Sequence, residues 1–247
     1  NCFIIYMNNK NIKSINILKN EEESIKAYSK NWNNNFSSLY NHITTTYQIN
    51  CSNDPDIVDA FSRDWSNLPG SADILFRPKN EIECAIIIKV CNFCNLPLTI
   101  SAGKTNLTGS ATPIGGAILS TSLLTSPGIQ VDINLKEVLS PVGISLEILR
   151  AEILKQSNRK LYYPVDPTSR HDAYVGGTLL CNASGFIPGE KGATRYWVNK
   201  IDILLPNGYL IKARRGDYIS QNGIFKLYFG NSQIILPIPK YKRPKIK

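Results

Sequence analysis

Apolar side chains recur at near-helical intervals after Asn80, which predicts a helix. The positions that carry the pattern are Ala85, Ile88, Val90 and Cys91. Asn80 is a suitable N-cap, and Glu83 three residues later completes a pair that satisfies free backbone donors at the helix start. Asn95 and Pro97 then end the helix.

Short apolar runs predict strands at Leu98–Ile100, Gly116–Ser120 and Ile129–Ile133. A second helix is expected after Ser145, which caps it, with Glu147 in its first turn. Its apolar face consists of Leu146, Leu149 and Ile153. A further helix is expected near the N-terminus, between Glu21 and Trp32.

Apolar and polar residues alternate on both sides of Asn207-Gly208, which predicts a β-hairpin. Asn-Gly suits a tight primed turn because that turn needs two positive φ angles. At most one more strand pair is expected from Ile219 onward. Strands and helices mix without a clean βαβ repeat, so the pattern predicts an α+β fold of two lobes, with mixed or antiparallel sheets flanked by helices.

Composition places few limits on the function. The chain is 43% hydrophobic and 19% charged, as is ordinary for a globular protein. No apolar run approaches the roughly 20 residues of a membrane span, and the opening NCFIIYM lacks the features of an export signal, so we expect a cytoplasmic protein. The net charge of +9 raises the question of an anionic partner. Much of the excess lies at Arg214-Arg215 and in the closing KYKRPKIK rather than in a stripe with interleaved aromatics, which favours a solvated surface over nucleic-acid binding.

Six cysteines are scattered along the chain, so a disulfide framework is not expected. Cys91 and Cys94 form a CxxC, which raises the question of a metal or redox site. No second CxxC accompanies it, and the only two histidines, His42 and His171, are distant in sequence. The pair also closes a helix rather than opening one, so core packing is favoured and no metal is expected.

The stretch ISAGKTNLTGSATPIGG, Ile100–Gly116, contains a Gly-Lys-Thr like that of a P-loop. A P-loop requires an earlier glycine where this chain has Leu98, so a nucleoside triphosphate site is not expected. The loop nevertheless follows a strand directly, as phosphate-holding loops do. Gly103 and Gly109 would let backbone N–H groups approach phosphate oxygens. Neutral donors would come from Thr105, Asn106 and Thr108, and a positive charge from Lys104.

A second loop of small residues lies in DPTSRHDAYVGGTLLCNASG, where one short helix or bend separates Gly176-Gly177 from Asn182–Gly185. Either loop alone is also explained as a tight turn. Two such loops, each beside a strand and with a capped helix between them, indicate a long ligand with a central pyrophosphate.

Three segments resemble the vanillyl-alcohol oxidase / p-cresol methylhydroxylase flavoprotein superfamily. PLTISAGKTNLTGSATPIGGAILS resembles its FAD-pyrophosphate segment, and YYPVDPTSRHDAYVGGTLLCNASG resembles its second motif. GATRYWVNKIDILLPNGYLI resembles the hairpin that closes the same FAD-binding PCMH-type domain. The resemblance implies an N-terminal, partly helical extension over 1–67, the FAD-binding domain over 68–217 in lobes of about 68–123 and 124–217, and over 218–247 a linker that starts a missing C-terminal domain.

Carried over residue by residue, the resemblance implies three groups of FAD contacts. The pyrophosphate loop would be Ser101, Ala102, Gly103, Lys104, Thr105, Asn106, Leu107, Thr108 and Gly109. The turn beside the flavin would be Asp166, Pro167, Thr168 and Ser169. Contacts with the flavin, ribityl chain and phosphates would come from Gly176, Gly177, Thr178, Asn182, Ala183, Ser184 and Gly185. Gly192 stands where the family has the glycine before the last strand pair.

The first loop departs from the family pattern. Ser101 replaces the usual arginine, and Ala102 and Lys104 replace glycines. Lys104 either restores the charge lost at position 101 or crowds the loop. Members that bond the flavin covalently carry a histidine where this chain has Thr105, so non-covalent FAD is implied.

The resemblance is strongest to the branch of D-lactate dehydrogenases and glycolate-oxidase flavin subunits. It implies hydride transfer from a 2-hydroxy acid to FAD, with substrate contacts and acid–base residues largely in a C-terminal cap domain. No catalytic residue is named, since His171 is expected to be a loop residue, and the electron acceptor is open. The alternatives are a non-catalytic remnant or subunit that may still bind FAD and, more distantly, a basic nucleic-acid-binding module.

Overall fold

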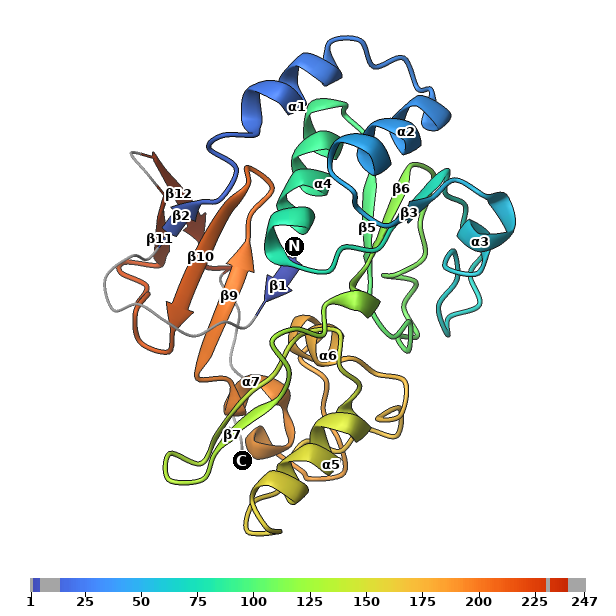
Figure 1. Cartoon of the computed structure of the whole chain (residues 1–247). Coiled ribbons are helices and arrows are strands. Elements are labelled where there is room, and N and C mark those ends of the chain that lie inside the picture. Colours follow the sequence, from blue (N-terminus) through green and yellow to red (C-terminus); the bar gives the residue numbers. More distant parts are fainter. Residues whose placement is uncertain (1, 5–13, 230–231, 240–247) are drawn as a thin grey trace.

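The computed structural model describes residues 2–4, 14–229 and 232–239. Figure 1 shows helices of the first half of the chain gathered over two sheets, with the segment of about 130–197 forming a separate group of short elements beneath them. Mixed sheets and helices in two groups confirm the predicted α+β class. No helix among the described residues is long and apolar enough to cross a membrane.

One four-stranded sheet supports the first glycine-containing loop. Its strands stand in the order β3 (Cys51–Ser52), β4 (Ile74–Phe76), β6 (Ala117–Ser120) and β5 (Leu98–Ser101). β4, β6 and β5 are parallel, and β3 is antiparallel to β4. Ser101 pairs with Ser120 at the last position of β5 and β6. The segments that follow these two strands therefore start side by side at one edge of the sheet.

Helix α4 (Glu81–Phe93) connects β4 to β5 and begins at the predicted cap. The Asn80 side chain accepts a hydrogen bond from the Glu83 N–H at 2.9 Å, and the Glu83 carboxylate accepts one from the Lys79 N–H at 2.8 Å. Every residue from Cys84 to Cys91 is buried. The middle of the helix is thus enclosed on all sides rather than on one face, and its two ends are more exposed.

The CxxC closes α4 and packs in the core. Cys91 is 2% exposed and Cys94 is 8% exposed. Burial raises the pKa of the Cys94 thiol to about 11, and burial also raises the pKa of Cys91. Both thiols stay protonated near neutral pH, in line with the expected packing role. No group of three or more His, Cys, Asp or Glu side chains in the described part of the chain could hold a metal ion.

The segment before Leu68 contributes to the same core, although its sequence shows little sign of one. Helices α1 (Glu22–Ser29) and α2 (Phe36–Thr46) bury Ile25, Leu39 and Ile43 completely in the cluster that includes α4. The short helix α3 (Pro55–Asp59) packs Val58 against the sheet. The described residues before Leu68 thus include the helices α1, α2 and α3, and the domain boundaries stay a prediction.

A second four-stranded sheet is antiparallel. Its order is β1 (Cys2–Ile4), β9 (Lys200–Leu204), β10 (Tyr209–Arg214) and β2 (Ser14–Asn16). The β9–β10 hairpin confirms the predicted pairing, but its turn is not the predicted one. Only Gly208 has a positive φ, of 85°, and its N–H donates to the Leu205 carbonyl at 2.9 Å. Pro206 accounts for this, since proline favours the first central position of an ordinary turn.

The second lobe is built around α5 (Leu146–Gln156). Ser145 caps it by accepting a hydrogen bond from the Ile148 N–H at 3.4 Å. Its buried face packs against Ala173 and Val175. Two further sheets of two strands each pair β7 (Gln130–Asp132) with β8 (Glu137–Leu139), and β11 (Ile224–Phe229) with β12 (Ser232–Pro237). The remaining described elements of the chain are the helices α6 (Val175–Leu180) and α7 (Thr194–Trp197) and the 3-10 turns η1 (Thr121–Leu123) and η2 (Glu190–Gly192).

Asp202 is a buried carboxylate in the centre of the antiparallel sheet. It is 2% exposed and lies opposite Lys212, whose ammonium is 3.8 Å from the carboxylate. Burial raises the pKa of Asp202 to about 7; Lys212 opposes this shift and Glu81 adds to it. The folded protein therefore retains a proton on this group over a range in which the unfolded chain releases it.

Replacing Asn80 by alanine tests the cap of α4. We expect Asn80→Ala to lower the free energy of unfolding by about 1 kcal/mol, because the Glu83 N–H at the helix start loses its acceptor. Asn92→Ala, an identical change at the exposed C-terminal end of the same helix, is the control and leaves stability nearly unchanged. Equal effects of the two variants in denaturant unfolding would contradict the role of the cap.

Asp202→Asn tests the buried carboxylate. An acid whose pKa is higher in the folded than in the unfolded state stabilises the fold while it is protonated. Wild-type stability relative to Asp202→Asn should therefore decline as pH rises from about 4, the ordinary pKa of aspartate, to about 7, and then level off. Unfolding free energies measured from pH 4 to 8 check this. Parallel pH profiles for the two proteins would show that the pKa of Asp202 is not raised.

Candidate functional site

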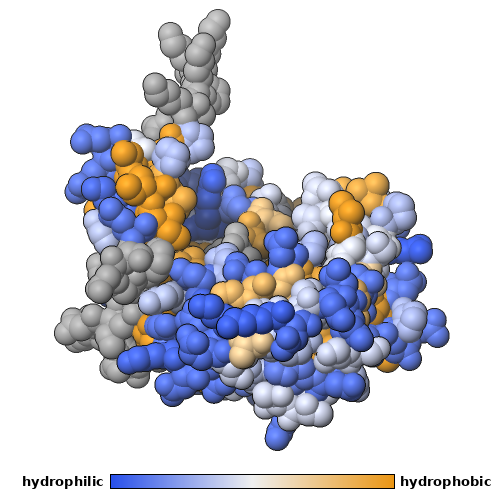
Figure 2. Space-filling model, turned by 90° about the horizontal axis from the view of Figure 1, so that it is seen from above, coloured by the Kyte–Doolittle hydropathy of each residue, from blue (hydrophilic) through white to orange (hydrophobic). Residues whose placement is uncertain are grey.

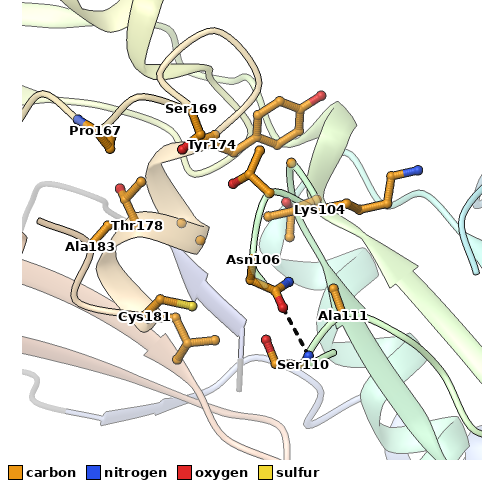
Figure 3. Close-up of a pocket in the computed structure, with 18 of the residues that line it drawn as sticks. Lys104, Asn106, Ser110, Ala111, Pro167, Ser169, Tyr174, Thr178, Cys181 and Ala183 are labelled. Carbon is orange, nitrogen blue, oxygen red and sulfur yellow. Dashed lines mark hydrogen bonds between the residues drawn. The ribbon is translucent and has the colours of Figure 1, made fainter. Parts of the chain in front are cut away.

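A cavity of about 390 Å³ lies where the loop after β5 meets the segment that leads into and out of α6. Figure 3 shows the two sets of side chains on either side of it. Its wall comprises Ile100, Ala102, Gly103, Lys104, Thr105, Asn106, Ser110, Ala111, Thr121, Val142, Pro167, Thr168, Ser169, Ala173, Tyr174, Gly176, Gly177, Thr178, Leu180, Cys181, Ala183 and Ser184.

The first loop offers unused backbone donors. Within the part of the chain that the structure describes, no hydrogen bond uses the backbone N–H groups of residues 102–107. These groups follow the end of a parallel strand, which is where α/β sheets bind ligands. Backbone donors without a protein partner are suited to anionic oxygens. The loop can therefore bind a phosphate group without a charged side chain.

Side chains at the far end of this loop fix its shape. The Asn106 carbonyl oxygen accepts hydrogen bonds from the N–H groups of Thr108 and Ser110, at 3.3 and 3.1 Å. Asp64 accepts one from the Ala111 N–H at 3.2 Å. Burial alone would raise the pKa of the Asp64 carboxyl, but hydrogen bonds from Ser66, Ala111 and Asn106 together lower it. Asp64 thus stays ionised and holds the loop.

Lys104 does not direct its charge into the cavity. Its ammonium donates to the Ala60 carbonyl at 2.7 Å and lies 4.8 Å from the centre of the Phe61 ring. Figure 3 shows the side chain leading away from the other wall residues. Partial burial lowers its pKa. Among the described wall residues Lys104 alone carries a charge, so the cavity is lined by neutral groups.

Gly103 brings the two halves of the site together. A Cβ atom at this position would lie only 1.8 Å from the carbonyl oxygen of Asp172, so no larger residue fits. Gly177 on α6 is the next close point, where a Cβ would lie 3.3 Å from that of Ala102. Both approaches join the first loop to the second, which explains small residues at these positions.

Ion pairs hold the turn that precedes α6. The Asp166 carboxylate lies 3.2 Å from guanidinium nitrogens of both Arg150 and Arg170, and Arg170 also pairs with Glu147 at 2.9 Å. These contacts fasten the turn to α5. Asp166 is not among the described wall residues. Its ion pairs instead hold in place the backbone that carries the wall residues Pro167, Thr168 and Ser169.

The structure brings most of the residues predicted for the site to one cavity. Those on its wall are Ala102, Gly103, Lys104, Thr105, Asn106, Pro167, Thr168, Ser169, Gly176, Gly177, Thr178, Ala183 and Ser184. Those outside the described wall are Ser101, Leu107, Thr108, Gly109, Asp166, Asn182, Gly185 and Gly192. Several of the second group support the loops: the Asn182 side chain accepts from the Arg195 N–H at 3.0 Å, and Gly185 packs against the Asp166 backbone.

Other wall residues were not predicted from the sequence. They are Ile100, Ser110, Ala111, Thr121, Val142, Ala173, Tyr174, Leu180 and Cys181. The sequence could have indicated two of them as wall residues: Thr121 directly follows a predicted strand, and Tyr174 directly precedes Val175-Gly176-Gly177. Val142 and Ala173 are brought in by packing of the second lobe. His171 is exposed and lies outside the described wall, as expected for a loop residue.

The wall suits a dinucleotide with a pyrophosphate. It combines free backbone donors on the first loop with hydroxyl groups, among them Thr121, whose Oγ1 is buried and has no hydrogen-bond partner in the described structure. A pyrophosphate needs several donors close to one another, and glycines at the loop contacts let the backbone supply them. The residues present therefore fit FAD.

Curated proteins that resemble the chain include several dehydrogenases. D-lactate dehydrogenase of Anaerostipes hadrus is 30% identical over 159 residues, which cover 64% of this chain and 33% of that protein. The mitochondrial D-2-hydroxyglutarate dehydrogenase of Danio rerio is 29% identical over 64% of this chain and 29% of that protein. Glycolate oxidase subunit GlcD of Bacillus subtilis (strain 168) is 28% identical over 57% of this chain and 29% of that protein. The chain spans about a third of the length of these relatives.

Solved structures share the fold at low sequence identity. Alkyldihydroxyacetonephosphate synthase superposes with a TM-score of 0.63 at 16% identity, over 77% of this chain and 36% of that one. Xylooligosaccharide oxidase from Myceliophthora thermophila C1 superposes with a TM-score of 0.59 at 15% identity, over 71% of this chain and 37% of that one.

Residues 72–214, more than half of the chain, match the family described as FAD binding domain. This segment contains both loops and the whole of the cavity wall. The chain therefore belongs to the FAD-binding domain family.

Proposed function

We propose that the cavity binds FAD non-covalently and that its two loops share the cofactor. The first loop contributes Ser101 to Gly109, and the second contributes Asp166 to Ser169, Gly176 to Thr178 and Asn182 to Gly185, with Gly192 supporting the second loop. Residues on the wall contact FAD directly. Those behind it, such as Asp166 and Asn182, hold the backbone in place.

The observation that carries the proposal is the row of unused N–H groups at residues 102–107, on a loop that meets the second loop at the Gly103–Asp172 and Gly177–Ala102 contacts. Backbone N–H groups that find no partner in a folded protein are costly unless water or a ligand binds them. A pyrophosphate supplies several acceptor oxygens in one ligand. Thr105 stands at the position where a covalent attachment would need a histidine, so the proposed flavin is dissociable.

We further propose that the whole protein oxidises a 2-hydroxy acid such as D-lactate or glycolate. The support is the activity for which relatives are named, D-lactate dehydrogenase and glycolate oxidase among them. When bound, the flavin supplies the hydride acceptor, and the described residues hold and orient it. No general base is assigned to the described residues, because His171 is exposed and lies outside the described cavity wall.

Cys181 provides a direct test of FAD binding. It is an exposed free thiol on the cavity wall, whereas Cys84, Cys91 and Cys94 are buried. We expect N-ethylmaleimide to label Cys181 in the cofactor-free chain, and saturating FAD to slow this labelling by about tenfold or more because the ligand covers the thiol. Peptide mass mapping follows each cysteine separately, and the buried thiols are internal controls.

The same sample should be yellow after reconstitution, with flavin released by acid. A chain that takes up no FAD would contradict the cofactor proposal. Flavin uptake with unchanged labelling of Cys181 would place the cofactor elsewhere.

Lys104→Met tests whether the lysine of the Gly-Lys-Thr sequence serves the cofactor. Because its ammonium bonds Ala60, we expect the FAD dissociation constant to change by less than about threefold, or ~0.7 kcal/mol. Lys79→Met removes the same charge from an exposed position and is the control. Titrations at low and high salt measure both. A tenfold loss for Lys104→Met alone would show that the ammonium turns to the phosphates.

A further inference from the structure

We propose that Thr121 is a positioning residue that hydrogen-bonds an oxygen atom of the bound dinucleotide, in its ribityl or phosphate portion. The proposal rests on the proposed function of the cavity and adds to it a residue outside both glycine-containing loops. Thr121 is the first residue of η1, directly after β6, and it lies on the cavity wall.

The hydroxyl of Thr121 lacks a partner. The residue is 5% exposed, and Oγ1 makes no hydrogen bond in the described structure. A buried hydroxyl without a partner destabilises a fold, whereas a valine of the same shape would carry no such cost. Threonine at this position therefore lowers the stability of the ligand-free protein relative to valine, and it becomes favourable once a ligand supplies a hydrogen-bond partner.

Three hydroxyl groups near Thr121 have partners within the protein. Thr178, which is also buried on the wall, donates to the Val175 carbonyl at 2.9 Å. Ser120 and Ser122, on either side of Thr121, bond one another at 3.1 Å. Among the described wall residues, Thr121 is thus the one whose side-chain hydroxyl is buried without a partner; Ser101, which lies behind the wall at the end of β5, shares this state.

The location of Thr121 favours a cofactor contact. β5 and β6 are parallel neighbours, so η1 starts beside the loop whose N–H groups are unused. A hydroxyl both donates and accepts, which suits polyol and phosphate oxygens alike. A change of χ1 exchanges the hydroxyl and the methyl group, so the side chain can present its oxygen without movement of the backbone.

Four variants of the full chain test the proposal. Thr121→Val removes the hydroxyl and keeps the shape, and the pair Thr121→Ser and Thr121→Ala differs only in the hydroxyl. Thr112→Val is the matched control, because the Thr112 Oγ1 is also buried without a partner, and the residue is not on the described wall. Each protein is titrated with FAD by calorimetry, and its thermal unfolding is measured with and without FAD.

We expect Thr121→Val to bind FAD about tenfold more weakly than wild type, which corresponds to about 1.4 kcal/mol. Thr121→Ser should bind like wild type, Thr121→Ala should bind as weakly as the valine variant, and Thr112→Val should bind like wild type. Without FAD, Thr121→Val should unfold at the same or a higher temperature than wild type, because no hydrogen bond is lost.

Two results would overturn the proposal while the cofactor site stands: wild-type affinity in both Thr121→Val and Thr121→Ala, or equal weakening by Thr112→Val. A lower unfolding temperature of cofactor-free Thr121→Val, with Ser and Ala binding alike, would show a structural role instead. Failure of the wild-type chain to bind FAD at all would overturn the proposed function, and with it this inference.

Discussion

The close approach of Gly103 to the Asp172 carbonyl is the contact on which the rest of the site depends. It joins the loop after β5 to the segment before α6, although about seventy residues separate them in sequence, as their numbering shows. A second contact between the same two loops joins Gly177 to Ala102. Glycine is required at position 103 because the two backbones meet there, and at position 177 a Cβ would lie 3.3 Å from the Cβ of Ala102. These two contacts hold the walls of the cavity at a fixed distance.

The surrounding structure keeps the donors of the first loop free. Parallel pairing of β5 with β6 ends at Ser101, and after that point the backbone N–H groups have no strand to bond. Asp64 and Asn106 fix the far end of the loop through backbone donors from 108 to 111, which leaves 102–107 unused. Lys104 is bound to Ala60, so neutral groups line the cavity. Preorganised backbone donors would thereby bind the phosphate groups of the cofactor without help from a charged side chain.

Local features were predictable because short-range chemistry determines them. The Asn80 cap, the Ser145 cap and the β9–β10 pairing all follow from residues within a few positions of one another. The hairpin turn was not predicted correctly, because Pro206 constrains the turn more strongly than Asn207-Gly208 does. Wall residues such as Val142 and Ala173 come from tertiary packing, and no local pattern marks them. The core contribution of α1 and α2 likewise depends on contacts with α4.

Two loops that are far apart in sequence are proposed to bind one FAD molecule together. Hydrogen–deuterium exchange of the full chain, with and without saturating FAD, tests it most directly because it reports on backbone N–H groups. FAD should slow exchange both in peptides covering 102–107 and in peptides covering 167–184, while α5 and the β9–β10 hairpin change little. Slower exchange in only one of the two loops, or in neither while flavin is bound, would contradict it.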